Sequence, residues 1–230
     1  MRPVDGKSSR LIGAMVGAAL SVIATSAWAE TTLRLGTNAA PLSAEVQASK
    51  EFARLVTERS GGELTVEVFE GDKLGKPVAQ IENLQLGTQD FHANVSDWLQ
   101  QMDKDWATLA MPFLFSSIEH VKLFQASDTY AQMKDRMATE HGVRVVADNW
   151  YRLPKVLVTT MPVFKPEDLE GVKLRMPNLA TYVDTWSAFG AKPTPLAWNE
   201  SYLAMKTGTV DGMDSPLNMV HPQKFYQAAP

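Results

Sequence analysis

One arginine in the sequence has the setting of an anion-binding group. Residues 172–178 (Val-Lys-Leu-Arg-Met-Pro-Asn) have the composition of a short strand. Successive side chains of a strand alternate between two faces, so Leu174 and Met176 share one face and Arg175 points to the other. A guanidinium group can form two parallel hydrogen bonds to a carboxylate. The stretch therefore predicts an arginine held at a strand end for a carboxylate ligand.

The residues after Arg175 predict the beginning of a helix. Pro177 favours an extended Met176 and ends the strand. Asn178 is a common helix cap, so we expect it to cap a helix that begins near Leu179. A helix N-terminus attracts anions and would add to the attraction of Arg175. A surface arginine in an ordinary strand–helix connection is the alternative interpretation.

Motifs for other kinds of chemistry are absent from the sequence. The chain has no cysteine, which excludes disulfides and thiolate chemistry. Its 4 histidines are far apart and show no metal-ligand spacing. There is no phosphate-binding loop, dinucleotide fingerprint or nucleophile elbow. We therefore expect a binding protein without metal or cofactor rather than an enzyme, although a catalytic site assembled from distant residues stays open.

The first 29 residues predict an export signal. Three basic residues precede an apolar stretch, and residues 27–29 (Ala-Trp-Ala) form a small-x-small cleavage site. We expect cleavage after Ala29, a mature chain from Glu30 and a periplasmic location; an uncleaved membrane anchor is the alternative. The formal charge of -4 becomes more negative without the basic leader, which argues against nucleic-acid binding.

Strand and helix patterns alternate along the rest of the chain, which is typical of an α/β protein. Residues 112–115 (Pro-Phe-Leu-Phe) have the composition of core. A helix is expected over residues 216–227. Strands are expected near residues 33–36, 64–68, 90–95, 143–147, 156–160 and 172–176.

A short motif occurs twice. Residues 84–90 and 205–211 both read as a helix end, then Gly-Thr-x-Asp, then a strand. The copies lie about 120 residues apart, too far for a solenoid repeat. They predict two related α/β lobes with a ligand between them, unless the similarity arose by chance. We assign residues 1–29 to the signal peptide, 30–149 to the first lobe and 150–230 to the second.

Several segments together resemble the solute-binding receptors of tripartite ATP-independent periplasmic (TRAP) transporters, the DctP-like family. The resemblance rests most on residues 171–178 and on residues 207–212 (Thr-Gly-Thr-Val-Asp-Gly). Further matching segments are 35–38, 74–75, 86–91, 112–115, 200–205 and 223–226. The family implies a two-domain periplasmic-binding-protein-like fold with hinge strands. It also implies a small organic acid bound between the lobes and TRAP permease membrane subunits as partners; we expect a monomer.

The resemblance implies roles for individual residues. Arg175 would form the salt bridge to the ligand carboxylate, with Arg152 as a second arginine and Asn38 as the contact from the first lobe. Ser215 stands where many members have a polar residue, and Asp214 precedes it. Because a carboxylate at 214 would repel an acid ligand, we expect Asp214 to contact a ligand hydroxyl or to point away.

Two further features bear on the ligand. Some family members have a glutamate in the strand after the first Gly-Thr-x-Asp, where this chain has Val95, which argues against polar sugar-acid ligands. Trp98, Trp150 and Trp198 are expected near the edges of the cleft, where they would suit a ligand with an apolar body. Ordinary packing is the alternative for each tryptophan.

The sequence therefore predicts a periplasmic receptor that binds a small organic acid and delivers it to a TRAP permease. An exported α/β enzyme acting on an organic acid and a ligand sensor for a membrane signalling protein are the alternatives. Members of the resembling family continue well past the segment at 223–226, so we expect the second lobe to be incomplete in this chain. Such a fragment would expose apolar faces, aggregate easily and bind ligand poorly.

Overall fold

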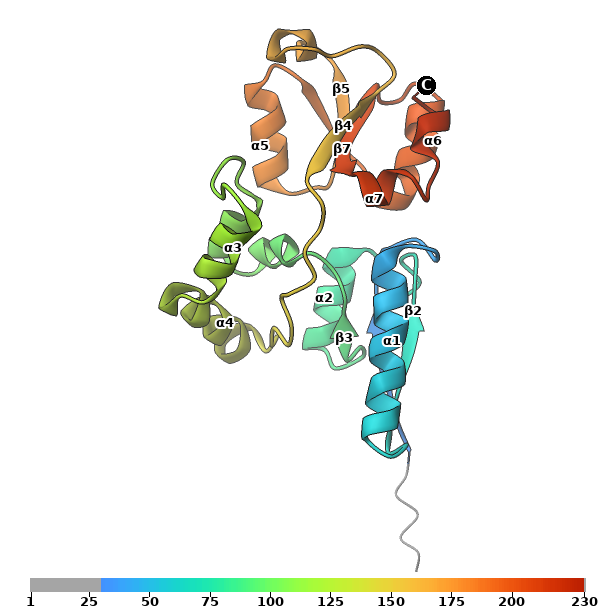
Figure 1. The fold of residues 1–230 in the computed structure, drawn as a ribbon, viewed down its shortest axis with the longest axis vertical. Helices are drawn as coiled ribbons and strands as arrows, with labels where there is room; N and C mark the ends of the chain where they lie inside the picture. Colours follow the sequence, from blue (N-terminus) through green and yellow to red (C-terminus); the bar gives the residue numbers. More distant parts are fainter. Residues whose placement is uncertain (1–29, 230) are drawn as a thin grey trace, which may run out of the picture.

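A computed structural model of the chain describes residues 30–229. The signal peptide expected over residues 1–29 lies outside the described residues. The described chain folds into two α/β lobes, each with its own sheet (Figure 1). Within this part of the chain, no helix has the length and apolar character needed to cross a membrane.

The first lobe contains a parallel sheet with the strand order β2-β1-β3. Its strands are β1 (Thr31–Gly36), β2 (Leu64–Phe69) and β3 (Phe91–His92). Its helices are α1 (Ala44–Arg59), α2 (Pro77–Gln85), the 3₁₀ helices η1 (Ser96–Gln101) and η2 (Lys104–Ala110), α3 (Ile118–Gln125) and α4 (Asp128–His141). Helix α1 begins where the Ser43 hydroxyl accepts a hydrogen bond from the Val46 amide. Helix α4 ends at Gly142, whose φ of 70° is left-handed.

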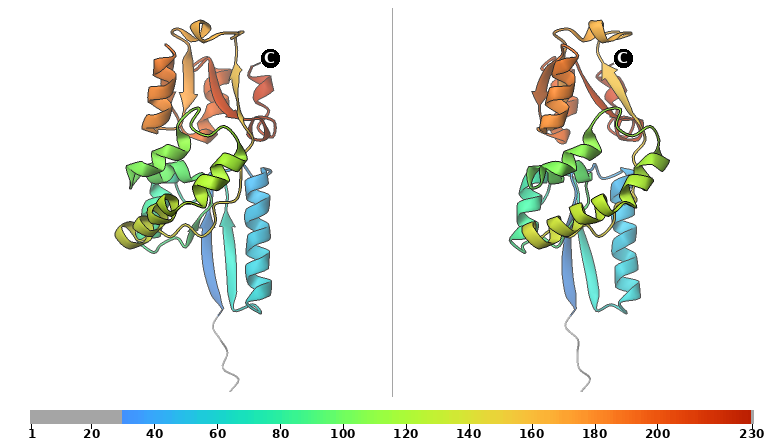
Figure 2. Two further views of the ribbon diagram at one scale, coloured as in Figure 1. Left: turned by 60° about the vertical axis from the view of Figure 1, so that its left-hand side comes forward. Right: turned by 90° about the vertical axis from the view of Figure 1, so that its left-hand side faces the viewer.

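The second lobe contains a mixed sheet with the order β4-β7-β5-β6, in which only β4 runs antiparallel to its neighbour. Its strands are β4 (Lys155–Thr159), β5 (Lys173–Met176), β6 (Lys192–Pro195) and β7 (Gly212–Pro216). Its helices are α5 (Ala180–Ala188), α6 (Ser201–Lys206), α7 (Leu217–Val220) and the 3₁₀ helices η3 (Pro166–Leu169), η4 (Trp198–Glu200) and η5 (Phe225–Gln227). Figure 2 shows this lobe and the first in two further views.

The repeated Gly-Thr-x-Asp motif makes the same contacts in both lobes. Gly87 and Gly208 are both left-handed, with φ of 68° and 73°. The Asp90 carboxylate accepts a hydrogen bond from the amide of Arg34 in β1 at 2.7 Å. The Asp211 carboxylate accepts one from the amide of Lys173 in β5 at 2.9 Å. Each motif thus ends a helix and holds a neighbouring strand of its lobe through a backbone amide, in agreement with two related lobes.

Arg175 lies on β5 between two apolar layers. Leu174 and Met176 are fully buried on one face, where they pack with Tyr182 and Trp186 of α5. The opposite face belongs to a second core cluster that includes Trp198, Met213 and Phe225. The alternation expected from the sequence is therefore observed. Burial on both faces fixes the register of β5, because a slip of one residue would exchange its faces.

Three local expectations are wrong. Residues 143–147 form coil rather than a buried strand, since no neighbouring strand of the described chain pairs with them. Residues 216–227 divide into the end of β7, the short helix α7 and a 3₁₀ turn instead of one helix. In residues 112–115, expected as core, Phe113 is 91% exposed because its left-handed backbone, with φ of 62°, turns the side chain outward.

The chain passes between the lobes through residues 143–154, a coil that leads from α4 into β4 (Figure 1). This coil contains Arg152, Trp150 and Tyr151. Arg152 therefore lies where the chain crosses between the lobes, while Arg175 lies on β5 of the second lobe.

Candidate functional site

Arg175 is a buried cation without a carboxylate partner among residues 30–229. Its relative exposure is 6%, and its Nε and Nη2 atoms both donate hydrogen bonds to the carbonyl oxygen of Leu196, at 3.0 and 2.6 Å. The guanidinium also lies 5.5 Å from the centre of the Trp198 ring. Burial lowers the pKa of Arg175 to about 10, an effect that Asp214, Tyr182 and Glu200 oppose from a distance. A buried charge in this state gains most from an anion.

The helix after Arg175 differs in detail from the sequence expectation. Helix α5 begins at Ala180, and its cap residue Leu179 makes no side-chain cap hydrogen bond. The side chain of Asn178 is exposed and does not act as the cap. The expected Asn178 cap is therefore wrong, because Leu179 packs into the core and moves the helix start by one residue.

Arg152, the second predicted arginine, is in contact with the first lobe. Its Nε atom lies 3.2 Å from Oε1 of Glu45, which belongs to the first turn of α1. Both side chains are largely buried, with 28% and 17% of their surface exposed. Arg152 therefore connects the crossing segment to α1 through a carboxylate of the protein itself.

Asp214 and Ser215 are neighbours on β7 and point to opposite faces of the sheet. The Asp214 Oδ2 atom forms an ion pair with Nζ of Lys155 at 2.9 Å. Lys155 also lies over the ring of Tyr182, 3.9 Å from its centre. Ser215 is buried opposite Val156 of β4. In this structure Asp214 is directed to a lysine, while its Oδ1 atom is buried without a hydrogen bond in the described chain.

A partly buried hydrogen bond joins the two lobes beside this ion pair. The Tyr182 hydroxyl on α5 donates to Oδ2 of Asp97 on η1 at 2.7 Å. Burial raises the pKa of Asp97, against the opposing effects of Tyr182, Lys155, Arg152 and the Trp98 amide. Gln100 and Thr181 make a second contact between the same elements at 3.4 Å. The lobes are thus in polar contact on the α5 side.

A second polar contact joins the lobes near Arg175. Lys76, at the start of α2, pairs with Glu200 of η4 at 3.1 Å. The hydrogen bond from Lys76 and the positive charges of Lys76 and Arg175 lower the pKa of Glu200. Asp72, in the loop before α2, faces Glu200 closely enough for that charge to raise its pKa further. These charged groups therefore form one network between the lobes. Its members are Asp72, Lys76, Asp97, Arg152, Lys155, Arg175, Glu200 and Asp214.

The remaining predicted site residues are less closely connected. Asn38 follows β1 and is half-buried, Trp98 is half-buried on η1, and Trp150 is 52% exposed on the crossing segment. No hydrogen bond or cation–π contact of the described residues joins these three to Arg175. Trp198, in contrast, is core and packs against Phe225 as well as Arg175.

Sequence reasoning missed most of the residues that form the polar contacts around the predicted arginines. These residues are Glu45, Lys76, Asp97, Lys155, Tyr182 and Glu200. Most of the contacts join positions tens of residues apart, so no local spacing reveals them. Lys155 lies next to a strand that the sequence pattern did predict, near residues 156–160, but the pairing of that strand with β7 was not predicted.

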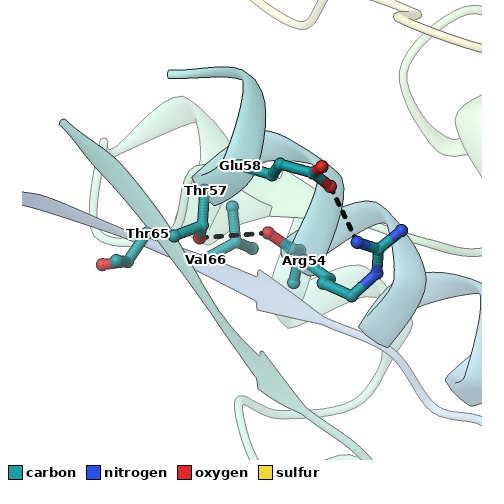
Figure 3. A pocket seen from close by; sticks show the side chains of 6 residues that line it. Arg54, Thr57, Glu58, Thr65 and Val66 are labelled. Atoms are coloured by element: carbon teal, nitrogen blue, oxygen red, sulfur yellow. Dashed lines mark hydrogen bonds and ion pairs between the residues drawn. The ribbon is translucent and has the colours of Figure 1, made fainter. Parts of the chain in front are cut away.

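A surface crevice of the described chain lies elsewhere, on the first lobe. It has a volume of about 560 Å³ and lies between α1 and β2, lined by Ala53, Arg54, Thr57, Glu58, Thr65 and Val66 (Figure 3). Arg54 is already paired with Glu51 and Glu58, each at 2.7 Å. This open crevice on the outside of the first lobe offers no unpaired charge, so the candidate site remains the region around Arg175.

Two lobes in contact around a buried cation define a ligand-binding protein of the periplasmic-binding-protein type. Comparison with known proteins gives the family. Residues 35–230 match the family of bacterial extracellular solute-binding proteins, family 7 (DctP), and the chain belongs to it. The predicted family and two-lobe α/β fold are thereby confirmed.

Individual relatives agree with this family. A solute-binding protein of Roseobacter denitrificans is 34% identical over 196 residues, which make up 85% of this chain and 60% of the relative. The sialic acid-binding periplasmic protein of Vibrio cholerae is 29% identical over 208 residues, 89% of this chain and 63% of the relative. The chain therefore spans less than two thirds of the length of these relatives.

A solved structure supports the same assignment. The TRAP periplasmic solute-binding protein of Roseobacter denitrificans with bound L-galactonate superposes with a TM-score of 0.81 at 34% sequence identity. The match covers 86% of this chain and 66% of that chain.

Asp72 gives a test of the charge network. Burial, which is the main cause, and Glu200 raise its pKa from 3.8 to about 6. A carboxyl whose pKa is higher in the folded state loses stabilisation as the pH rises from about 3.8 to about 6. Asp72→Asn removes this cost and suits the left-handed backbone, with φ of 64°. We expect the variant to gain about 1 kcal/mol at pH 7.5, a value discounted for partial exposure, and nothing at pH 3.5.

Urea unfolding at both pH values measures this difference. Asp184→Asn, at an exposed position on α5, is the control for removing a charge. An equal gain for Asp72→Asn at the two pH values would contradict the pKa argument.

Proposed function

We propose that the protein is a periplasmic receptor that binds a small organic acid between its lobes and delivers it to a TRAP-type membrane permease. The observation that carries the proposal is Arg175, a buried guanidinium whose hydrogen bonds within residues 30–229 go to one backbone carbonyl. A ligand carboxylate would supply the missing counter-ion. Membership in a solute-binding family supports a receptor rather than the enzyme alternative.

Other residues complete the proposed site. Arg152 lies in the segment that crosses between the lobes, Asn38 follows β1 of the first lobe, and Asp214 and Ser215 lie near the end of β7, the strand next to β5. Trp98 and Trp150 form the proposed rim, where their exposed or half-buried rings can contact the body of the ligand. Arg152 contacts a second ligand group only if it leaves Glu45, so we assign it a smaller share of the affinity than Arg175.

Relatives suggest the kind of acid. The Roseobacter denitrificans protein holds L-galactonate, the Vibrio cholerae relative is named for sialic acid, and an Escherichia coli relative is named for 2,3-diketo-L-gulonate. We infer that this chain also takes a sugar acid. Val95, where some family members have a glutamate, is a single position that disfavours such a ligand. The structure brings other carboxylates, Asp97 and Asp214, to the same region.

The mechanism we propose is closure of the lobes over the ligand. Contacts from both lobes favour the closed arrangement, and opening releases the ligand to the permease. The contacts Asp97–Tyr182 and Lys76–Glu200 already join the first lobe to the second in this structure. Bound ligand would add contacts to both lobes at once.

Removal of Arg175 tests the binding site. In Arg175→Ala, the ligand carboxylate loses its buried partner, which lowers affinity by roughly 30-fold to several thousand-fold. Arg175→Lys should recover little, because a point charge does not replace the two-pronged guanidinium. Calorimetry with a sugar acid that the parent protein binds measures the affinities of both variants. Arg54→Ala, at an exposed ion pair on α1, is the control. Unchanged affinity in Arg175→Ala would place the site elsewhere.

Closure is tested by small-angle X-ray scattering with and without a saturating ligand. We expect a smaller radius of gyration in the presence of ligand, because the lobes approach each other. The Arg175→Ala variant at the same ligand concentration should scatter like the ligand-free protein. Identical curves for the parent protein with and without ligand would exclude closure.

We also propose export through a cleaved signal peptide, which the sequence of residues 1–29 indicates. N-terminal sequencing of protein recovered from the periplasm should begin at Glu30. An intact N-terminal Met1 on exported protein would contradict this proposal.

A further inference from the structure

The charges around Arg175 are nearly all balanced by the protein itself. Four cations lie in the network between the lobes: Lys76, Arg152, Lys155 and Arg175. Lys76 pairs with Glu200 at 3.1 Å, Arg152 with Glu45 at 3.2 Å, and Lys155 with Asp214 at 2.9 Å. Within residues 30–229 only Arg175 of the four has no carboxylate within ion-pair distance. The site therefore has room for one negative charge.

The same region contains buried acceptors that lack donors. Oδ1 of Asp97, Oδ1 of Asp214 and both carboxylate oxygens of Glu45 are buried and make no hydrogen bond of normal geometry with the described residues. A buried acceptor without a donor costs free energy, and a ligand hydroxyl is a suitable donor. Asp214 is only 9% exposed, so water compensates it poorly.

A second carboxylate on the ligand would meet the opposite situation. It would find three cations that already have partners and several carboxylate oxygens that repel it. Like charges in a poorly solvated cleft repel each other strongly. To bind such a group, the protein would have to break one of its own ion pairs and leave a buried carboxylate alone.

We propose that the site selects polyhydroxylated acids with a single carboxylate and discriminates against the corresponding diacids. The ligand carboxylate would pair with Arg175 on one face of the sheet, and the ligand hydroxyl groups would reach past the strand ends to the free oxygens of Asp214 and Asp97 on the α5 side. This inference rests on the proposed function and adds the class of ligand. The discrimination comes from carboxylates that repel the wrong ligand as well as from contacts with the right one.

Matched acids test the selectivity. D-Galactonate and galactarate have the same carbon chain and differ at carbon 6, which is an alcohol in the first and a carboxylate in the second. D-Gluconate and D-glucarate form a second pair of different stereochemistry, and hexanoate has the single carboxylate without hydroxyl groups. Calorimetry at pH 7.5 should show that at least one monoacid binds about tenfold or more tightly than its diacid, and more tightly than hexanoate.

Two variants test the cause. Asp214→Asn removes a negative charge and frees Lys155, and Glu200→Gln does the same for Lys76. In both, the affinity ratio of monoacid to diacid should shift toward the diacid by about tenfold. Glu200 is 48% exposed, so its variant should fold even if the buried change at 214 does not. Glu58→Gln, in an exposed ion pair outside the cleft, should leave the ratio unchanged.

The outcomes separate this inference from the proposed function. Equal or tighter binding of the diacid by the parent protein would overturn the inference, while loss of binding in Arg175→Ala would still support the receptor. An unchanged ratio in Glu200→Gln and Asp214→Asn would also overturn it. If none of the five acids binds the parent protein, the inference fails together with the proposal that the ligand is a sugar acid.

Discussion

The structure depends on the burial of one positive charge. Arg175 is held in β5 between two apolar layers, and the carbonyl of Leu196 is the acceptor for two of its nitrogens. Placing a guanidinium in such a position is unfavourable unless an anion joins it. The lowered pKa of Arg175 expresses the same cost. Features around Arg175 can be understood as ways of keeping this charge in place.

The first of these features is the pair of Gly-Thr-x-Asp motifs. Each motif ends a helix with a left-handed glycine and directs an aspartate to a strand amide, that of Arg34 within β1 or that of Lys173 at the start of β5. In the second lobe that strand is β5, so Asp211 helps to set the register that turns Arg175 away from Leu174. The same construction in the first lobe positions β1, from which the chain continues to Asn38. The two copies of the motif thus help to position Arg175 in the second lobe and Asn38 in the first.

The sequence could predict what depends on neighbouring residues. Alternation in residues 172–176 placed Arg175 opposite Leu174 and Met176, and the repeated motif indicated two lobes; both were observed. Expectations failed where the tertiary environment decides. Asn178 did not become the cap, because the packing of Leu179 took precedence. Residues 143–147 have strand composition but no strand beside them.

The partners of the site residues could not be predicted for a related reason. Asp97 and Tyr182 are 85 positions apart, and Lys76 and Glu200 are 124 apart. Such contacts depend on how the two lobes sit together, which leaves no periodic signal in the sequence. A charged residue far from any motif, such as Glu45, looks like ordinary surface until the fold brings Arg152 to it. The sequence therefore indicates Arg152 as a ligand residue but gives no sign of its carboxylate partner Glu45.

The contacts between the lobes also bear on what drives closure. Lys76 and Glu200 are 63% and 48% exposed, and an ion pair of that kind contributes about 0–1 kcal/mol. The Asp97–Tyr182 hydrogen bond is partly buried, and burial raises the pKa of Asp97, which marks a cost of keeping that carboxyl charged. These contacts hold the lobes together only weakly. In the proposed receptor, the larger contribution would come from the ligand carboxylate, because it neutralises Arg175 where water is excluded. A closed state that depends on the ligand in this way opens again when the ligand leaves, as delivery to a permease requires.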